Sequence, residues 1–335
     1  MGLPILYQIS CQSDFATAFL IKINKVNHYQ SHKPVLLKEV LEALKPKDGE
    51  VFIDGTFGAG GYSKAILQAA NCSVIAFDRD DNVKKFVEPL SKEFGDKVQF
   101  INSPFSQMEH KVSHKVDGIV LDLGVSSMQL DEEERGFSFG SSARLDMRMD
   151  HTSGINAYDV VNSFEEIELS KIIRDFGEEK KHRRIAKKIV EARQKGEIKT
   201  GLELAEIVKK VYGFQAGKIH PATKTFQAIR IFVNDELGEL KAALASAENM
   251  LKSNGRLVIV SFHSLEDSLV KAFMREKSGY NDRNFSRYEP LSVMTEQKKT
   301  YSFSLPTNSS IKPGDDELKD NIRSRSARLR LALKN

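Results

Sequence analysis

Runs of apolar residues that each end in a polar side chain recur along the chain and predict strands. The runs occupy residues 51–53, 74–77, 98–101, 116–121 and 256–260. Continuous apolar runs of this length are typical of parallel strands that are buried on both faces. Residues 327–332 alternate apolar and polar positions and predict a half-exposed strand. The pattern therefore indicates an α/β fold.

A long insertion separates the fourth and fifth predicted strands. About 130 residues lie between positions 122 and 256, whereas a crossover connection needs a few dozen. Capping-box patterns and apolar periodicity make the insertion helical. We expect helices from Ser163 to about 175, from His182 to about 195, from Thr200 onward, and from Thr223 to about 249. The insertion leaves from the carboxyl ends of the strands, where ligands bind in such sheets, so it is placed to cover the site.

The glycine-rich turn after the first strand is the most informative motif. The strand ends in Asp54, glycines occupy positions 55, 58, 60 and 61, and the second strand ends in Asp78. This layout is typical of a nucleotide-binding βαβ unit, in which the acid binds ribose hydroxyls. A dinucleotide motif would need glycine at position 63, which is Ser63. The spacing favours the S-adenosylmethionine loop of Rossmann-like methyltransferases, with a bare strand-to-helix turn as the alternative.

Four residues that follow strand ends are candidates for the site. Asp122 is placed to accept a hydrogen bond from a nucleophilic amine, or to cap a helix or hold the cofactor. Phe105 would stack on adenine or pack in the core, and Gln129 would bind the cofactor's polar end or be solvated. We interpret His263 as substrate-orienting, because no Gly-x-Ser-x-Gly elbow supports a hydrolase triad. The histidines show no ligand spacing, so no metal site is predicted.

Composition fits an ordinary enzyme. Of 335 residues 40% are hydrophobic, and the net charge of +4 leaves any preference for nucleic acid to local patches. Cys11 and Cys72 form no disulfide or metal framework, which fits a reducing cytoplasm. No apolar run reaches the roughly 18 residues of a membrane span. We expect residues 1–27 to form a disordered extension.

Basic residues cluster in two places. Residues 180–199 contain nine Lys or Arg against Glu191 and Glu197, and four arginines lie between 323 and 330. A charge run alone is often a solvated helix face. Two runs around one predicted cofactor site favour contacts with a phosphate backbone.

Several motifs together resemble the RsmH (MraW) family of bacterial 16S ribosomal RNA cytosine-N4 methyltransferases. The resemblance runs from about residue 30 to the C-terminus. Its motifs are residues 32–40 (HKPVLLKEV), 54–61 (DGTFGAGG), 121–127 (LDLGVSS), 135–139 (RGFSF), 145–149 (LDMRM), 220–230 (HPATKTFQAIR), 261–267 (SFHSLED) and 323–327 (RSRSA).

The resemblance implies methyl transfer from S-adenosylmethionine to the exocyclic amine of a cytosine in the decoding region of small-subunit RNA. The family's cofactor contacts then fall on Gly60, Gly61, Tyr62, Asp78, Phe105, Asp122 and Gln129. Position 62 is often His in the family, so the backbone is the safer contact there. The Pro-Pro-aromatic motif common in amino-methyltransferases is absent after Asp122, so other groups must hold the base.

We therefore predict a Rossmann-like methyltransferase with a seven-stranded, mostly parallel sheet. Residues 28–133 and 219–335 would bind the cofactor, and a helical insert at 134–218 would recognise 16S rRNA in the small ribosomal subunit. Two rival interpretations remain, a small-molecule methyltransferase and a non-catalytic RNA-binding protein. A homodimer is left open.

Overall fold

The computed structural model describes residues 34–213, 220–280 and 300–335. The predicted extension at 1–27, and the start of the first family motif at His32 and Lys33, lie outside the described residues.

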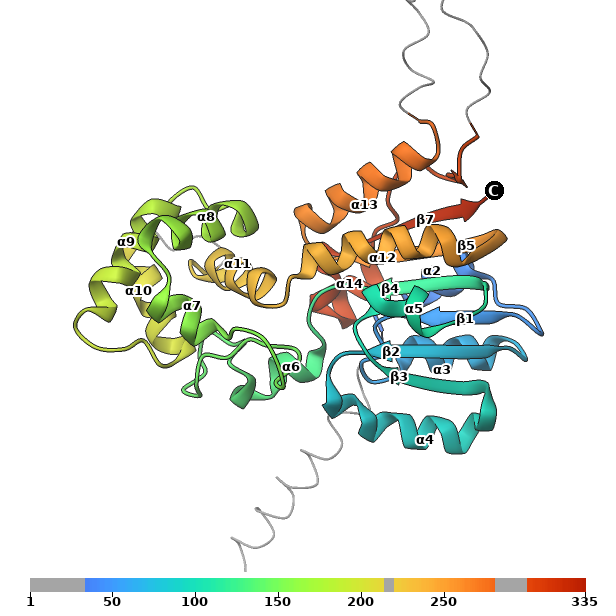
Figure 1. Cartoon of the computed structure of the whole chain (residues 1–335), viewed down its shortest axis with the longest axis horizontal. Helices are drawn as coiled ribbons and strands as arrows, with labels where there is room; N and C mark the ends of the chain where they lie inside the picture. Colours follow the sequence, from blue (N-terminus) through green and yellow to red (C-terminus); the bar gives the residue numbers. More distant parts are fainter. Residues whose placement is uncertain (1–33, 214–219, 281–299) are drawn as a thin grey trace, which may run out of the picture. The chain divides into compact units, whose positions relative to one another are not determined.

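Seven strands in the described part of the chain form one sheet (Figure 1). Their order is β3-β2-β1-β4-β5-β7-β6. The first five in this order pair in parallel, whereas β7 pairs antiparallel with both β5 and β6. The predicted fold class is confirmed. The strands are β1 Val51–Asp54, β2 Ser73–Asp78, β3 Val98–Asn102, β4 Val116–Asp122, β5 Leu251–Ser261, β6 Phe303–Ser304 and β7 Arg328–Lys334.

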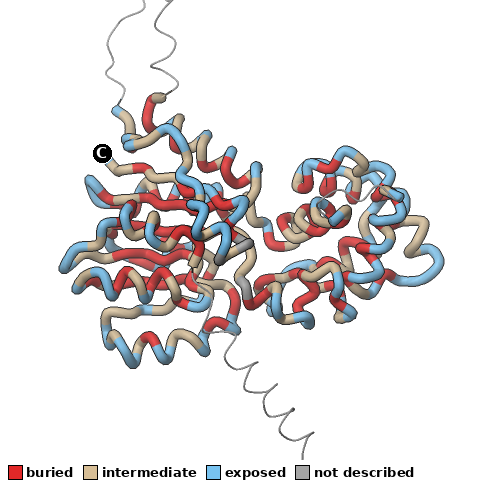
Figure 2. The backbone as a smooth tube through the Cα atoms, turned by 180° about the vertical axis from the view of Figure 1, so that it is seen from behind, coloured by how far each residue is buried: buried red, intermediate tan, exposed pale blue. Residues whose placement is uncertain are grey.

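Both faces of the sheet are buried because successive side chains alternate between two cores. Phe52 packs with α2, α3 and α4 on one face, and Ile53 packs with α5, α12 and α13 on the other (Figure 1). Figure 2 shows the central strands as the most buried segments. This burial explains the continuous apolar runs. These helices are α2 Leu37–Leu44, α3 Gly61–Ala69, α4 Lys84–Phe94, α5 Met108–Lys111, α12 Glu236–Met250 and α13 Ser264–Lys277.

The helices between β4 and α12 share a third hydrophobic core of their own. Phe137, Leu145 and Met147 join this core from the loop that precedes α7. The elements are α6 Ser127–Asp131, α7 Ala157–Ser163, α8 Glu166–Gly177, α9 His182–Arg193, α10 Gly201–Tyr212 and α11 Thr223–Val233. The predicted capping box at Thr200 is present, with Glu203 as its partner. A last short helix, α14, spans Asp315–Asp320.

Two predicted helix boundaries are wrong. Ser163 ends α7, and the capping box of α8 pairs Glu165 with Glu168. The single helix expected from Thr223 to about 249 is two helices, because Asp235 adopts a left-handed conformation with φ 46°. Asn and Asp tolerate that conformation and compete with helical hydrogen bonds, so the pair Asn234-Asp235 suits a break.

Buried polar contacts join the helical insert to the sheet. The Asn234 side chain donates to the Met147 carbonyl and accepts from the Met149 amide, both at 2.7 Å. Arg79, which directly follows β2, donates to the Asn234 carbonyl at 2.9 Å. The Arg135 guanidinium donates to Asp80 at 2.8 Å, and both side chains are at most 5% exposed. No described helix is long and apolar enough to cross a membrane.

The buried pair makes a strong prediction for stability. Arg135→Ala should lower the free energy of unfolding by roughly 3–5 kcal/mol, because it leaves the Asp80 carboxylate buried without its cation. Lys92→Ala, which breaks an exposed pair with Glu88, is the control and should change stability by less than about 1 kcal/mol. Urea denaturation followed by circular dichroism measures both. Equal effects of the two substitutions would contradict this account.

Candidate active site

The glycine turn forms a tight cradle between β1 and α3. Gly58 and Gly60 have φ of 53° and 79°, which side chains other than glycine rarely adopt. A Cβ at Gly60 would lie 2.9 Å from the ring of Phe57. A Cβ at Gly55 would lie 2.3 Å from Leu121, so the strand-to-turn junction has no room for a side chain. The helix α3 begins directly after the turn, at Gly61.

The buried side chain of Asp54 stabilises this turn through hydrogen bonds. Its carboxylate accepts hydrogen bonds from the Ser63 hydroxyl at 2.7 Å and from the Thr56 amide at 3.2 Å. The side chain is fully buried, and this burial raises its pKa, although the hydrogen bonds oppose the shift. Ser63, which departs from the dinucleotide motif, therefore has a specific partner in the loop.

Asp78 lies beside the same turn. One carboxylate oxygen accepts from the Gly58 amide at 2.8 Å, and the other accepts from the Asp80 amide at 2.9 Å. Burial raises the pKa of Asp78 to about 6 against the lowering effect of those amides. The structure therefore brings the glycine turn and the predicted ribose acid together. The contact with ribose itself stays a prediction.

Asp122 combines burial with an unused acceptor. Its amide donates to the Thr56 hydroxyl at 2.7 Å, which ties the end of β4 to the glycine turn. Its Oδ1 atom is buried, with no hydrogen-bond partner among the described residues. Burial raises the pKa of Asp122 well above its usual range, and the charges of Asp54 and Glu266 add to the shift. A buried carboxyl oxygen without a partner is uncommon and suits a ligand or a substrate.

Tyr62 lies against this carboxyl group. Its hydroxyl donates to the Val35 carbonyl, and the ring is 4% exposed. Burial raises the pKa of the phenol far above its usual value, with the neighbouring charge of Asp122 as the next cause. The tyrosine side chain is committed to the protein interior, which supports the expectation that the backbone is the contact at this position.

Gln129 is buried and not solvated. Its amide nitrogen donates to Asp80 at 2.9 Å, and its carbonyl oxygen accepts from the Ser126 amide in a capping box. Phe105 is half-buried beside the glycine turn, where its Cβ would lie 3.1 Å from a Cβ at Gly55. The proposed contacts of both residues with a cofactor stay predictions.

Sequence reasoning missed Asp80 and Arg135 as parts of the site. The Asp80 carboxylate accepts hydrogen bonds from Arg135, Gln129 and the Asn82 amide. It therefore connects the predicted ribose acid, Asp78, to the insert. Arg135 also donates to the carbonyl groups of Arg148 and Met149. The sequence did contain a signal for this contact. Arg135 lies in the motif at 135–139, and the two residues whose carbonyl groups it binds lie in the motif at 145–149.

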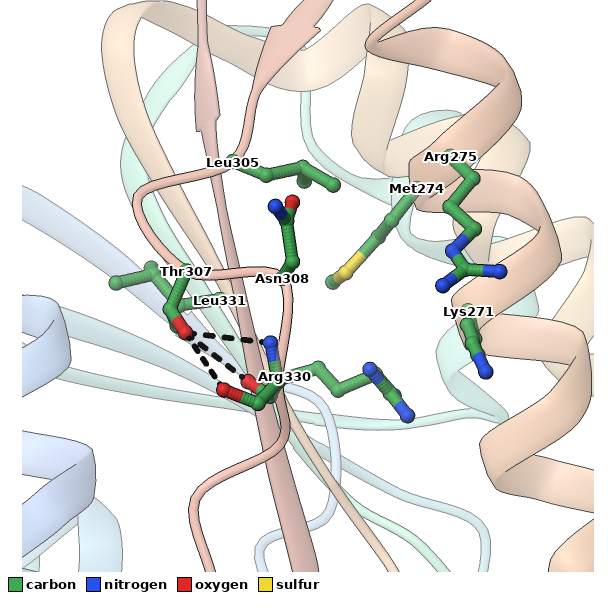
Figure 3. Close-up of a pocket in the computed structure, with 9 residues that line it drawn as sticks. Lys271, Met274, Arg275, Leu305, Thr307, Asn308, Arg330 and Leu331 are labelled. Atoms are coloured by element: carbon green, nitrogen blue, oxygen red, sulfur yellow. Dashed lines mark hydrogen bonds between the residues drawn. The ribbon is translucent and has the colours of Figure 1, made fainter. Parts of the chain in front are cut away.

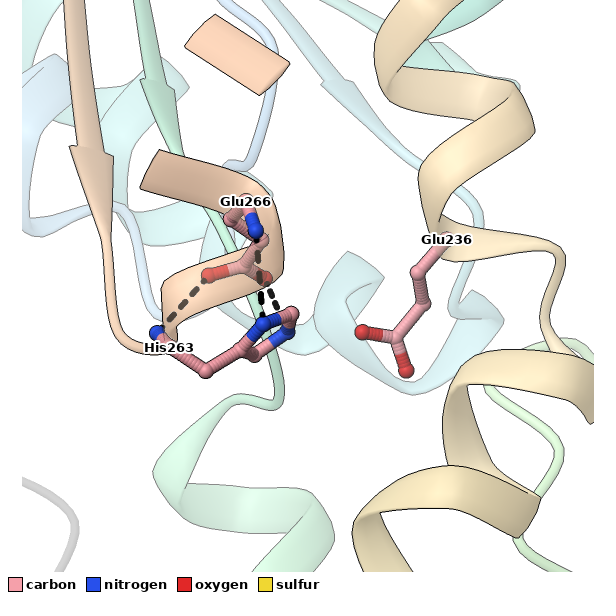
Figure 4. Close-up of side chains that lie close together, drawn as sticks. All are labelled: Glu236, His263 and Glu266. Carbon is pink, nitrogen blue, oxygen red and sulfur yellow. Dashed lines mark hydrogen bonds and ion pairs between the residues drawn. The ribbon is translucent and has the colours of Figure 1, made fainter. Parts of the chain in front are cut away.

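His263 caps α13 and lies between two carboxylates (Figure 4). Its Nε2 atom is 3.0 Å from Glu266, and ligand atoms of His263, Glu266 and Glu236 all lie within 4.8 Å of one another. Such a trio has the donor types of a metal site. Arg230, however, binds both oxygens of Glu236 at 2.8 and 2.9 Å, so this carboxylate already has a cationic partner. We assign no metal to this cluster.

Two of the C-terminal arginines, both on β7, bind a carboxylate on α13. Asp267 on α13 accepts two hydrogen bonds from Arg330 at 2.7 and 3.0 Å and one from Arg328 at 3.0 Å. Arg330 also lines a shallow pocket between α13, β7 and the loop at 305–309, where Lys271 and Arg275 project from the helix (Figure 3). None of the residues of the glycine cradle lines that pocket.

The chain matches the model of the MraW methylase family over residues 29–335. It belongs to this family. A protein of Maricaulis maris named ribosomal RNA small subunit methyltransferase H is 50% identical over 308 residues, which is 91% of each chain. A relative of the same name from Rickettsia massiliae is 52% identical over 304 residues, or 90% of this chain and 98% of its own. An rRNA methylase structure from Streptococcus thermophilus aligns with 89% of this chain and 93% of its own, at 11% identity and a TM-score of 0.37.

Membership of this methylase family makes S-adenosylmethionine the methyl donor. The site fits such a group on two observations. A Cβ at Gly58 would have the Thr56 carbonyl oxygen at 3.9 Å as its one neighbour within 4 Å, which leaves room for a ligand beside the turn. Burial raises the pKa values of Asp54, Asp78 and Asp122, and no cation is among the groups that lower them. A cationic sulfonium would supply such a charge.

Asp78→Ala should weaken binding of S-adenosylhomocysteine by roughly 1–3 kcal/mol, because charge-assisted hydrogen bonds to ribose would be lost. Titration calorimetry measures the dissociation constant. Asp117→Ala is a matched control, because Asp117 lies at the start of β4 and binds the Val51 amide and Lys252. An unchanged constant in Asp78→Ala would remove this residue from the site.

Proposed function

We propose that this protein transfers a methyl group from S-adenosylmethionine to the N4 amine of a cytosine in the decoding region of 16S ribosomal RNA. The names of its relatives support ribosomal RNA of the small subunit as the substrate. The base and the atom rest on the family resemblance and on one observation. Asp122 offers a buried, unpartnered carboxyl oxygen at the carboxyl end of β4, beside the glycine turn.

The amine of cytosine is a poor nucleophile because its lone pair is delocalised into the ring. When bound, S-adenosylmethionine supplies an electrophilic methyl group on a good leaving group. Asp122 would accept a hydrogen bond from the amine and take the proton that the nitrogen loses when it gains the methyl group, with S-adenosylhomocysteine as the leaving group. Holding the amine in line with the methyl group supplies roughly 7–11 kcal/mol of barrier lowering. His263, fixed by Glu266 at the end of β5, would orient the base.

The cofactor would contact the backbone of Gly60, Gly61 and Tyr62 and the side chains of Asp78 and Asp122. Phe105 would stack on its adenine. Gln129 would reach its polar end while keeping the bond to Asp80.

The helical insert would bind RNA through α9. Arg183, Arg184 and Lys187 are exposed on this helix, and none of them has an ion-pair partner among the described residues. Arg193, in contrast, donates to the Val161 carbonyl at 3.0 Å and helps to hold the insert together. Unpaired exposed cations are available to phosphate groups.

A methylation assay tests the function directly. Small ribosomal subunits, naked 16S rRNA and a pool of metabolites are incubated with the protein and S-adenosylmethionine labelled in the methyl group. The RNA is then digested to nucleosides. Label in N4-methylcytidine is expected. Label in another nucleoside, or in a metabolite, would overturn the proposal.

Asp122→Asn should slow methyl transfer by roughly 10²–10⁴-fold, while the affinity for S-adenosylhomocysteine changes much less. The wild-type kcat/KM should also fall as pH is lowered through the raised pKa of Asp122, because protonation removes the acceptor. Asp122→Asn should lack that limb of the pH profile. Equal losses of binding and turnover would make Asp122 a cofactor ligand only.

Reversing the charge of Arg183, Arg184 and Lys187 to Glu should weaken RNA binding and flatten its salt dependence. Each lost phosphate contact removes roughly 0.7–0.9 from the slope of log affinity against log salt. The control reverses Lys38, Lys84 and Lys92, which are exposed on α2 and α4, and so makes the same change in net charge. Filter binding across a salt series compares the two proteins. Equal slopes would leave α9 as a solvated helix face.

A further inference from the structure

An exposed pair of stacked aromatic rings lies on the insert, outside the site described above. The rings of Phe139 and His220 are 4.8 Å apart between centroids and only 12° from parallel. Phe226, which is 4% exposed, meets Phe139 edge-on at 4.8 Å. His220 is exposed, and Phe139 is half-buried. The buried ring thus supports the half-buried one, which in turn supports an imidazole at the surface.

A backbone amide two residues later fixes the orientation of the imidazole. His220 Nδ1 accepts a hydrogen bond from the Ala222 amide at 3.3 Å. In the neutral ring this leaves the proton on Nε2, where it is available to donate. The side chain is therefore a flat, oriented surface with one polar edge.

Two basic residues lie close to the pair in the sequence. Arg144 follows Phe139 in the same loop, is exposed, and stacks on Tyr158 at 4.7 Å. Lys224, four residues after His220, lies in the first turn of α11 and donates to the Glu178 carbonyl. Neither cation forms an ion pair with a carboxylate in the described part of the chain. Flat rings together with basic side chains are the combination that binds unpaired nucleotides.

The pair is also continuous with the catalytic edge of the sheet. Phe139 packs on the same hydrophobic core as Val125 and Leu130, which belong to the segment that follows Asp122. The loop that carries Phe139 and the segment after Asp122 therefore share one hydrophobic core.

We propose that Phe139 and His220 form a stacking platform for an unpaired nucleobase of the RNA, next to the target cytosine. The proposal rests on the proposed RNA methylation. The platform would hold the single strand in the extended form that the active site needs, and it would contribute to RNA binding without touching the cofactor.

A fluorescent base tests the platform. Single-stranded oligonucleotides that span the target sequence carry 2-aminopurine at each position in turn, and the same strands in a perfect duplex serve as the RNA control. Stacking on a ring quenches 2-aminopurine. The wild-type protein should quench at least one single-strand position and none in the duplex.

His220→Ala should abolish that quenching and raise the dissociation constant of the single strand by roughly 5- to 100-fold. His220→Phe keeps a flat ring and should recover most of both. His114→Ala, at an exposed histidine that makes no ring contact among the described residues, should behave as wild type. With small subunits as substrate, His220→Ala should raise KM and leave kcat nearly unchanged. Affinity for S-adenosylhomocysteine checks that each variant is folded.

If His220→Ala bound and quenched the oligonucleotides as well as the wild-type protein, the platform would be overturned. It would also be overturned if His220→Phe bound as weakly as His220→Ala. If the wild-type protein instead quenched the oligonucleotides but methylated no small subunits, the proposed function would fail while the platform stood.

Discussion

The carboxylate of Asp80 is the point on which the arrangement of the molecule depends. It is buried, and a buried charge is tolerated only with a cation and hydrogen bonds around it. Arg135 provides the cation, Gln129 and the Asn82 amide provide the bonds, and Arg135 then reaches two carbonyl groups of the insert. Because Asp80 follows Asp78 so closely, the segment that shapes the nucleotide cradle is also the segment that anchors the insert.

The electrostatics of the cradle follow from the parallel sheet. The carboxyl ends of β1, β2 and β4 meet at one edge and deliver Asp54, Asp78 and Asp122 together. Arg135 forms an ion pair with Asp80, and Arg230 forms one with Glu236. Burial raises the pKa values of Asp78 and Asp122 at this edge, and no cation offsets the shift, which favours a cationic ligand over an anionic one. A pyrophosphate cofactor would meet repulsion at the same place.

The strands and the glycine turn could be predicted because their signals are local. An apolar run buried on both faces, and a glycine that must have positive φ, are visible within a few residues. The break at Asn234-Asp235 was missed because apolar periodicity continues across it. The partners of Asp80 and the stacking of His220 on Phe139 join positions far apart in the sequence, so no local pattern reports them. The sequence left Gln129 open between a cofactor contact and a solvated residue, and only the fold shows that it is buried.

The pairing of β4 with β5 has a consequence for how the chain folds. About 130 residues separate these neighbouring strands, and contacts of such long sequence separation form slowly. During synthesis β1 to β4 emerge first and can pair with one another. The edge of β4 that pairs with β5 stays unpaired until β5 has been synthesised. An apolar strand with an open edge is prone to pair with other chains. The helical insert has a core of its own, so it can form in that interval and shorten the effective distance that β5 must close.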